Sequence, residues 1–193
     1  MAWTFLHELR RKVLHVTILL LIILYSILEK SVSKEIALFT LVFLLIMLLI
    51  AEYLRLELNI ELPLMKQFIR AKEERRMNGA IYFLSAAVIC LAVFDFRIAL
   101  AALVMTALGD MAAAIVGKKF GKTLIFKDKT ITGCAVEVVV NLIVGFIVLN
   151  NIYMMIAMAF TATIVEAAVS ELDDNLFVPL FAGFVGQLLF FLM

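Results

Sequence analysis

Long apolar stretches separated by short polar segments run along almost the whole chain. Seven can be marked, at residues 13–28, 35–54, 80–94, 97–116, 133–149, 152–169 and 176–192. A helix of about 20 residues crosses the hydrocarbon core of a bilayer, so the shorter stretches must thin the bilayer or use flanking residues. The pattern predicts an all-α fold, a polytopic membrane helical bundle with about seven transmembrane helices.

The composition favours the same class. Of the 193 residues, 65% are hydrophobic, and the mean hydropathy is +1.12, which is more than the core of one soluble domain needs. Pro and Gly are few and the apolar runs do not alternate with polar residues, which favours helices over an outer-membrane barrel. Because no repeat, low-complexity tract or linker interrupts the chain, residues 1–193 are predicted to form a single integral-membrane domain.

The distribution of Lys and Arg predicts the orientation. When the loops are assigned alternately to the two sides, 14 of the 17 basic residues fall on one side, and the other side receives Lys30, Lys34 and Arg97. Positive residues gather on the cytosolic side of membrane proteins. We therefore expect the N-terminus in the cytosol and the C-terminus outside.

Six carboxylates lie near the predicted cytosolic ends of the apolar stretches: Glu52, Asp110, Glu137, Glu166, Asp173 and Asp174. A charge at the bilayer centre costs at least about 2.5 kcal/mol, so each invites a functional hypothesis. A snorkelling or salt-bridged residue near a helix end explains any single one equally well. Snorkelling or salt bridges explain less well why all six carboxylates lie at the same depth in the membrane. Residues three or four apart share a helix face, which predicts Asn141 beside Glu137 and Thr163 beside Glu166.

Two predicted cytosolic segments are long enough to have structure. In residues 55–79, Pro63 opens a pattern typical of a short interfacial helix. Residues 117–132 are rich in Gly, Lys and Thr. Carboxylates beside such a loop suit a magnesium-bound polyphosphate, since Mg²⁺ prefers oxygen ligands and ammonium groups neutralise phosphate. Cytosolic topology alone also explains the lysines, and helix packing explains the Gly117-x-x-x-Gly121 spacing.

Several strings resemble the signature of the CTP-dependent polyisoprenoid lipid kinases, the family of dolichol kinase, phytol kinase and the CTP-dependent diacylglycerol kinase. They are GDMAAAIVGKKFGKT at 109–123, KDKTITGCAVE at 127–137, RRKVLH at 10–15, ATIVEAAVSELDDNLFVPL at 162–180 and, more faintly, ERRMNGAIYF at 74–83. Together they cover most of the chain in the family's order. Thr132 and Cys134 depart from the residues that the family often has beside its Lys-Thr-x-x-Gly motif.

The resemblance implies transfer of the γ-phosphoryl group of CTP to the hydroxyl of a membrane lipid, at an active site facing the cytosol. It implies Mg²⁺ as cofactor, held by Asp110 and by one or both of Asp173 and Asp174. Glu137 or Glu166 would accept the hydroxyl proton or complete the metal shell, and the choice between them stays open. The nucleotide would be held by Arg11, Lys12, His15, Gly117, Lys118, Lys119, Gly121, Lys122, Lys127, Lys129, Thr130 and Gly133.

The expected partners are CTP, a lipid alcohol and the bilayer, and no nucleic acid. The nearest alternative function is a phosphatidate or lipid cytidylyltransferase that makes a CDP-lipid, although the usual Pro-Gly-His-Gly-Gly signature of that family is absent. A membrane transporter is the second alternative, but it would be expected to place polar groups near the midplane. Gly183 and Gly186 fit two arrangements equally well, namely helix contacts in a homodimer and helix packing within one chain.

Overall fold

The computed structural model describes residues 19–60, 76–126, 129–169 and 173–193. The chain divides into two compact units, Met1–Val88 and Ile89–Met193, which are described separately. Most of the interfacial helix expected within 55–79 lies outside the described residues, as do the first predicted span up to residue 18 and the site residues Arg11, Lys12, His15 and Lys127.

The first unit contains two long helices and the beginning of a third. A helix whose described part is 19–31 is followed by α2 (Lys34–Leu56), and the beginning of α4 (Gly79–Val93) also belongs to this unit. Helix α2 begins where the Ser33 hydroxyl accepts a hydrogen bond from the backbone N–H of Ile36, at 3.3 Å. Many large apolar side chains of α2 are exposed, among them Phe39 at 73%, as expected for a helix surface that faces lipid.

Glu52 has a structural role within the first unit. Its Oε1 accepts hydrogen bonds from Arg55 Nη2 at 2.6 Å and from the backbone N–H of Asn78 at 2.8 Å. The Arg55 guanidinium also donates to the carbonyl of Arg76. These contacts join the end of α2 to the beginning of α4 and compensate the charge of a carboxylate that is 2% exposed.

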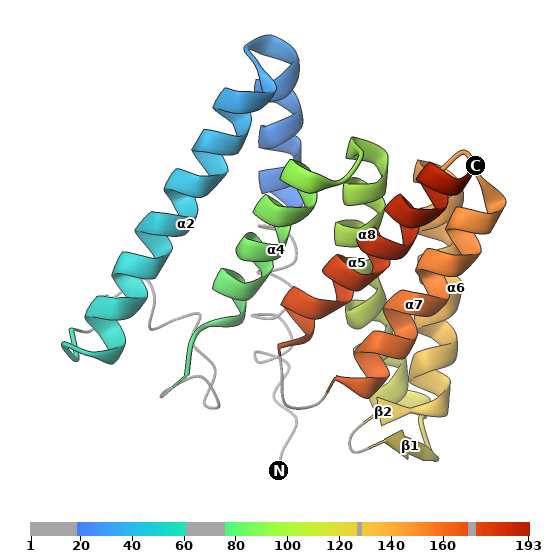
Figure 1. Cartoon of the computed structure of the whole chain (residues 1–193). Coiled ribbons are helices and arrows are strands. Elements are labelled where there is room, and N and C mark those ends of the chain that lie inside the picture. Colours follow the sequence, from blue (N-terminus) through green and yellow to red (C-terminus); the bar gives the residue numbers. More distant parts are fainter. Residues whose placement is uncertain (1–18, 61–75, 127–128, 170–172) are drawn as a thin grey trace. The chain divides into compact units, whose positions relative to one another are not determined.

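The second unit is a bundle of four helices (Figure 1): α5 (Phe96–Phe120), α6 (Ile131–Val148), α7 (Ile152–Ala168) and α8 (Asp174–Leu192). Each begins at a side chain that accepts from a backbone N–H of its first turn, namely Asp95, Thr130, Asn151 and Asp173. Helices α5 and α7 each pack against both α6 and α8. The bundle therefore has a closed interior in which α5 is the most deeply buried long helix.

Small residues allow the helices of the second unit to approach closely. A Cβ added at Gly183 of α8 would lie 2.4 Å from the Phe94 ring, and one at Gly186 would lie 2.4 Å from Met158 Sδ. Both glycines thus pack within the chain, which accounts for them without a second copy.

The segment between α5 and α6 is more regular than the loop expected from the sequence. Helix α5 continues to Phe120, and the chain then forms a short antiparallel hairpin of β1 (Leu124–Phe126) and β2 (Lys129–Thr130), visible at one end of the bundle in Figure 1. This hairpin was not predicted, because two strands of three and two residues leave no recognisable alternation in the sequence.

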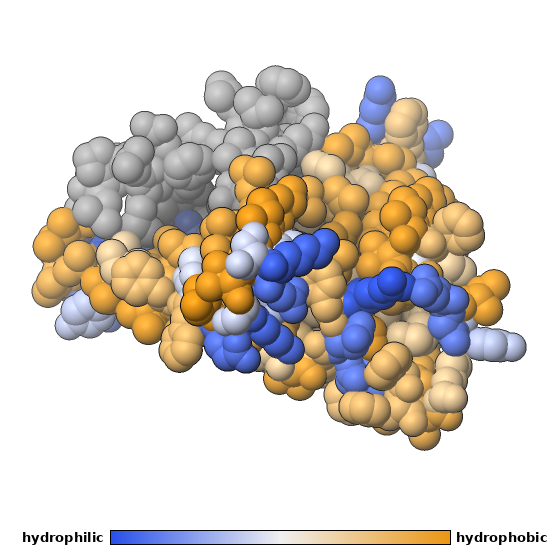
Figure 2. Space-filling model, turned by 90° about the horizontal axis from the view of Figure 1, so that it is seen from above, coloured by the Kyte–Doolittle hydropathy of each residue, from blue (hydrophilic) through white to orange (hydrophobic). Residues whose placement is uncertain are grey.

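The predicted helical fold is confirmed, with four described helices long and apolar enough to cross a membrane: α2, α5, α6 and α8. Helices α4 and α7 are apolar but shorter. On the face shown in Figure 2 the coloured residues are mainly hydrophobic, with hydrophilic side chains in a few separate groups. These features are compatible with a membrane protein, while the number of seven spans and the cytosolic N-terminus stay predictions.

The predicted orientation is testable by labelling introduced cysteines in sealed cells, in a chain whose Cys134 is replaced by Ala. A membrane-impermeant maleimide is expected to label a Lys30→Cys variant from outside, and to label Lys122→Cys only after the membrane is permeabilised, because the two positions lie on opposite predicted sides. Labelling of Lys122→Cys in sealed cells would contradict the orientation.

Candidate functional site

A close contact between α5 and α6 positions the hairpin. A Cβ at Gly117 would lie 2.8 Å from Thr130 Oγ1 and 3.4 Å from the Cα of Gly133, and one at Gly121 would lie 2.5 Å from Thr130 Oγ1. Thr130 also caps α6, since its hydroxyl accepts from the backbone N–H of Gly133 at 3.1 Å. The three predicted phosphate-binding glycines therefore make room for this contact, and Thr130 is held in place beside them.

Residue Lys129 comes directly before Thr130 and reaches the interior of the bundle. Its ammonium forms an ion pair with Glu166 of α7, a carboxylate that is 1% exposed, while the Lys129 side chain itself is 30% exposed. The pair connects two positions 37 residues apart in the chain. The Lys129 side chain is therefore partly exposed at the end of the bundle where the hairpin lies, while its ammonium pairs with a buried carboxylate.

The carboxylate of Glu137 on α6 lies beside Glu166, close to the Thr163 hydroxyl and within the field of Lys129. Glu137 is 2% exposed. When both carboxylates are ionised, the Lys129 ammonium balances only one of their two charges. The arrangement therefore favours a further cation or a proton at this place.

One helical turn deeper, Asn141 extends the polar cluster. Its Nδ2 donates to Thr163 Oγ1 at 3.3 Å, and its buried Oδ1 has no hydrogen-bond partner among the described residues. A Cβ at Gly109 of α5 would lie 2.6 Å from this Oδ1 and 3.1 Å from Glu137 Cγ. Gly109 is therefore the point at which α5 contacts the polar face of α6.

The predicted metal residues lie on two different helices. Asp110 follows Gly109 on α5 and is 9% exposed. Asp173 and Asp174 are half-buried at the beginning of α8, where Asp173 Oδ1 accepts from the backbone N–H of Asn175 at 3.1 Å and from its Nδ2 at 2.7 Å. Asp173 thus has a structural role as a helix cap. In the part of the chain that is described, no group of three His, Cys, Asp or Glu side chains is arranged to hold a metal ion.

The remaining predicted nucleotide-binding lysines, Lys118, Lys119 and Lys122, are exposed at the end of α5 and just beyond it. The Lys119 ammonium lies 5.2 Å from the centroid of the Phe120 ring. Together with Lys129 they give this end of the second unit four ammonium groups, which makes it a suitable surface for a polyphosphate.

The sequence marks Asn141 and Thr163 only as neighbours of the glutamates, and it does not mark Gly109 as a contact residue. The spacing of four residues between Glu137 and Asn141 was the available signal. The capping role of Thr130 was also predictable from the sequence, because a Thr directly before an apolar run is a common helix start.

No family model, curated protein or solved structure matches this chain. The similarity of its strings to the lipid kinase signature therefore stays an inference from those residues.

The ion pair of Lys129 and Glu166 is expected to stabilise the second unit. Replacing Lys129 by Met leaves the buried Glu166 charge without its partner and should lower the free energy of unfolding in mild detergent by about 1–3 kcal/mol. The double variant with Glu166→Gln should recover most of this loss, and Lys122→Met, at an exposed lysine, should change little. If the effects of the two single changes simply add, the pair is not coupled.

Proposed function

We propose that this chain is a CTP-dependent lipid kinase that transfers the γ-phosphoryl group of CTP to the hydroxyl of a polyprenol-type membrane lipid, as dolichol kinase does. The observation that carries the proposal is the buried pair of Glu137 and Glu166 with the Lys129 ammonium. It lies next to the exposed lysines at the end of α5. The strings that resemble the kinase signature include all of these residues.

Phosphoryl transfer needs little covalent chemistry from a protein. It needs the donor, the acceptor and the neutralising charges to be held in line. In the proposed enzyme, the exposed lysines at the end of α5 bind the β- and γ-phosphates, and Lys129 lies between them and the carboxylates. CTP rather than another nucleotide is proposed from the resemblance alone.

The acceptor hydroxyl is proposed to lie against Glu137. Of the two glutamates, Glu166 forms the ion pair with Lys129, whereas no described residue forms an ion pair with Glu137. Glu137 is therefore the better proton acceptor, and Glu166 positions Lys129. During transfer the hydroxyl oxygen forms a bond to the γ-phosphorus, the bond from that phosphorus to the bridging oxygen of CDP breaks, and the hydroxyl proton passes to Glu137.

Mg²⁺ is the expected cofactor, and it would supply charge neutralisation at the phosphates. Mg²⁺ bound with a nucleotide usually has one or two carboxylate ligands and fills its shell with phosphate and water oxygens. Asp110 is the proposed protein ligand, with Asp174 as a second. Asp173 is a weaker candidate, because its Oδ1 already accepts from Asn175.

The proposal places the active site on the cytosolic side of an integral, multi-pass protein. The basic residues at the hairpin end favour the cytosolic side, because Lys and Arg are enriched in the cytosolic loops of membrane proteins. A lipid alcohol has its hydroxyl at the membrane interface, which is where the hairpin would lie.

Incubation of the purified protein with magnesium, labelled CTP and a panel of lipid alcohols tests the reaction. Label from γ-labelled CTP is expected in a lipid monophosphate, most strongly with a polyprenol-type alcohol. If α-labelled CTP instead enters a lipid, the chain is a cytidylyltransferase, and if neither label enters a lipid, the kinase proposal fails.

Two substitutions test the assigned residues in the same assay. Asp110→Asn and Glu137→Gln keep the side-chain shape but remove the charge, and each should lower turnover about a hundredfold or more. Glu35→Gln, at an exposed carboxylate of α2, serves as the matched control and should stay near wild type. Near wild-type turnover in a folded Asp110→Asn variant would rule out its role as the metal ligand.

A further inference from the structure

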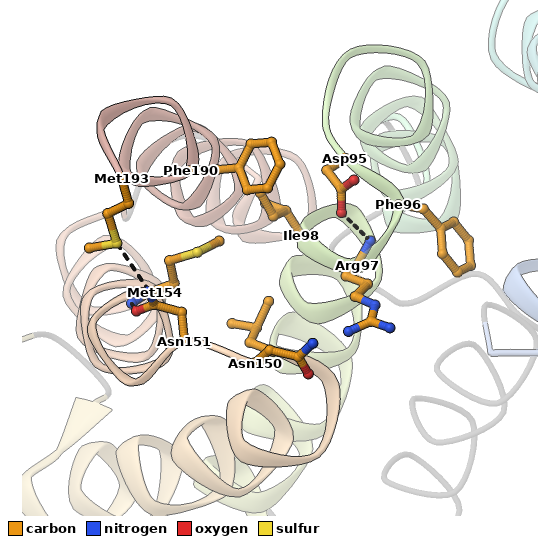
Figure 3. A pocket seen from close by; sticks show the side chains of 10 residues that line it. Asp95, Phe96, Arg97, Ile98, Asn150, Asn151, Met154, Phe190 and Met193 are labelled. Atoms are coloured by element: carbon orange, nitrogen blue, oxygen red, sulfur yellow. Dashed lines mark hydrogen bonds between the residues drawn. The ribbon is translucent and has the colours of Figure 1, made fainter.

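A cavity of about 670 Å³ lies at the other end of the second unit, between the beginning of α5, the α6–α7 connection and the end of α8 (Figure 3). This volume falls within the range of small-molecule pockets, about 300–1,000 Å³. Its apolar lining comes from Ile98, Leu149, Met154 and Phe190, among others. Several exposed apolar residues follow at the same helix ends, including Phe191 at 76%.

The polar lining of the cavity carries one positive and one negative side chain. The guanidinium of Arg97 extends away from the Asp95 carboxylate in Figure 3, and neither it nor the amide of Asn150 forms a hydrogen bond with another described side chain. Asp95 Oδ1 accepts from the backbone N–H of Arg97 at 2.9 Å. Its second carboxylate oxygen has no hydrogen-bond partner among the described residues.

This cavity is separate from the carboxylate cluster. Along α5, Ile98 of the cavity and Asp110 of the cluster are separated by a rise of about 18 Å. Glu137 and Leu149, the residue that caps the end of α6, are equally far apart along that helix. A ligand in the cavity would therefore not take part in chemistry at Glu137 and Glu166.

We propose that this cavity binds the headgroup of a zwitterionic phospholipid, with its phosphate on Arg97 and Asn150 and its ammonium on Asp95. A guanidinium and an amide N–H₂ group are good phosphate donors, and the free carboxylate oxygen accepts from an ammonium. The apolar lining holds the first part of the acyl chains. The remainder of the chains lies along the exposed apolar residues at the helix ends. The lipid is a bound structural ligand and not the kinase substrate.

Titration of the delipidated protein in detergent, followed by native mass spectrometry, tests the proposal. The expected result is one phosphatidylethanolamine per chain, bound at least about tenfold more tightly than a diacyl lipid with an uncharged sugar headgroup. Glycerophosphoethanolamine, which has the headgroup but no chains, should also bind at least tenfold more weakly. If it binds as tightly as the lipid, the ligand is a soluble phosphate compound and the lipid proposal is wrong.

Two substitutions test the roles of the Arg97 and Asp95 charges one at a time. Arg97→Gln should weaken phosphatidylethanolamine binding about tenfold, whereas Lys34→Gln, at an exposed cation on the same predicted side, should not. Asp95→Asn keeps a residue that caps helices well, and it should weaken the binding of phosphatidylethanolamine but not of phosphatidylglycerol, which lacks the ammonium. Equal effects of Arg97→Gln and Lys34→Gln, or no preference for a charged headgroup, would overturn the proposal.

Discussion

The contact of Gly117 with Gly133 is the constraint on which the candidate site depends. Because neither residue has a Cβ, α5 and α6 approach closely, and the Thr130 hydroxyl fills the remaining space while it caps α6. That contact fixes where the hairpin ends, so the residue directly before Thr130, Lys129, pairs with Glu166 of α7. A larger side chain at either glycine would separate the helices and move the ammonium away from its partner.

The interior of the second unit combines an apolar bundle with a small polar cluster. Asp110, Glu137, Asn141, Thr163 and Glu166 are all buried, and they come from three helices. Burying carboxylates is costly, and the described ion pair with Lys129 offsets only part of that cost. Apolar residues at these positions would stabilise the bundle more, so the polar cluster is a candidate for a functional role.

Much of the fold followed from the sequence, because apolar runs bounded by polar residues mark helices directly. Helices α6 and α8 each begin two residues before the expected position, since Thr130 and Asp173 cap them. Pairings such as Lys129 with Glu166 depend on how helices far apart in the chain pack, which no local pattern contains. The cavity beside Arg97 was not predicted for the same reason.

The central claim is that the cluster transfers a phosphoryl group to a lipid hydroxyl. Phosphorus NMR of a complete reaction tests it most directly, since it identifies both products at once. The account predicts CDP and a lipid phosphomonoester in equal amounts, with both signals strongly reduced for Glu137→Gln after the same reaction time. Pyrophosphate together with a lipid pyrophosphate diester, or unchanged CTP, would contradict it.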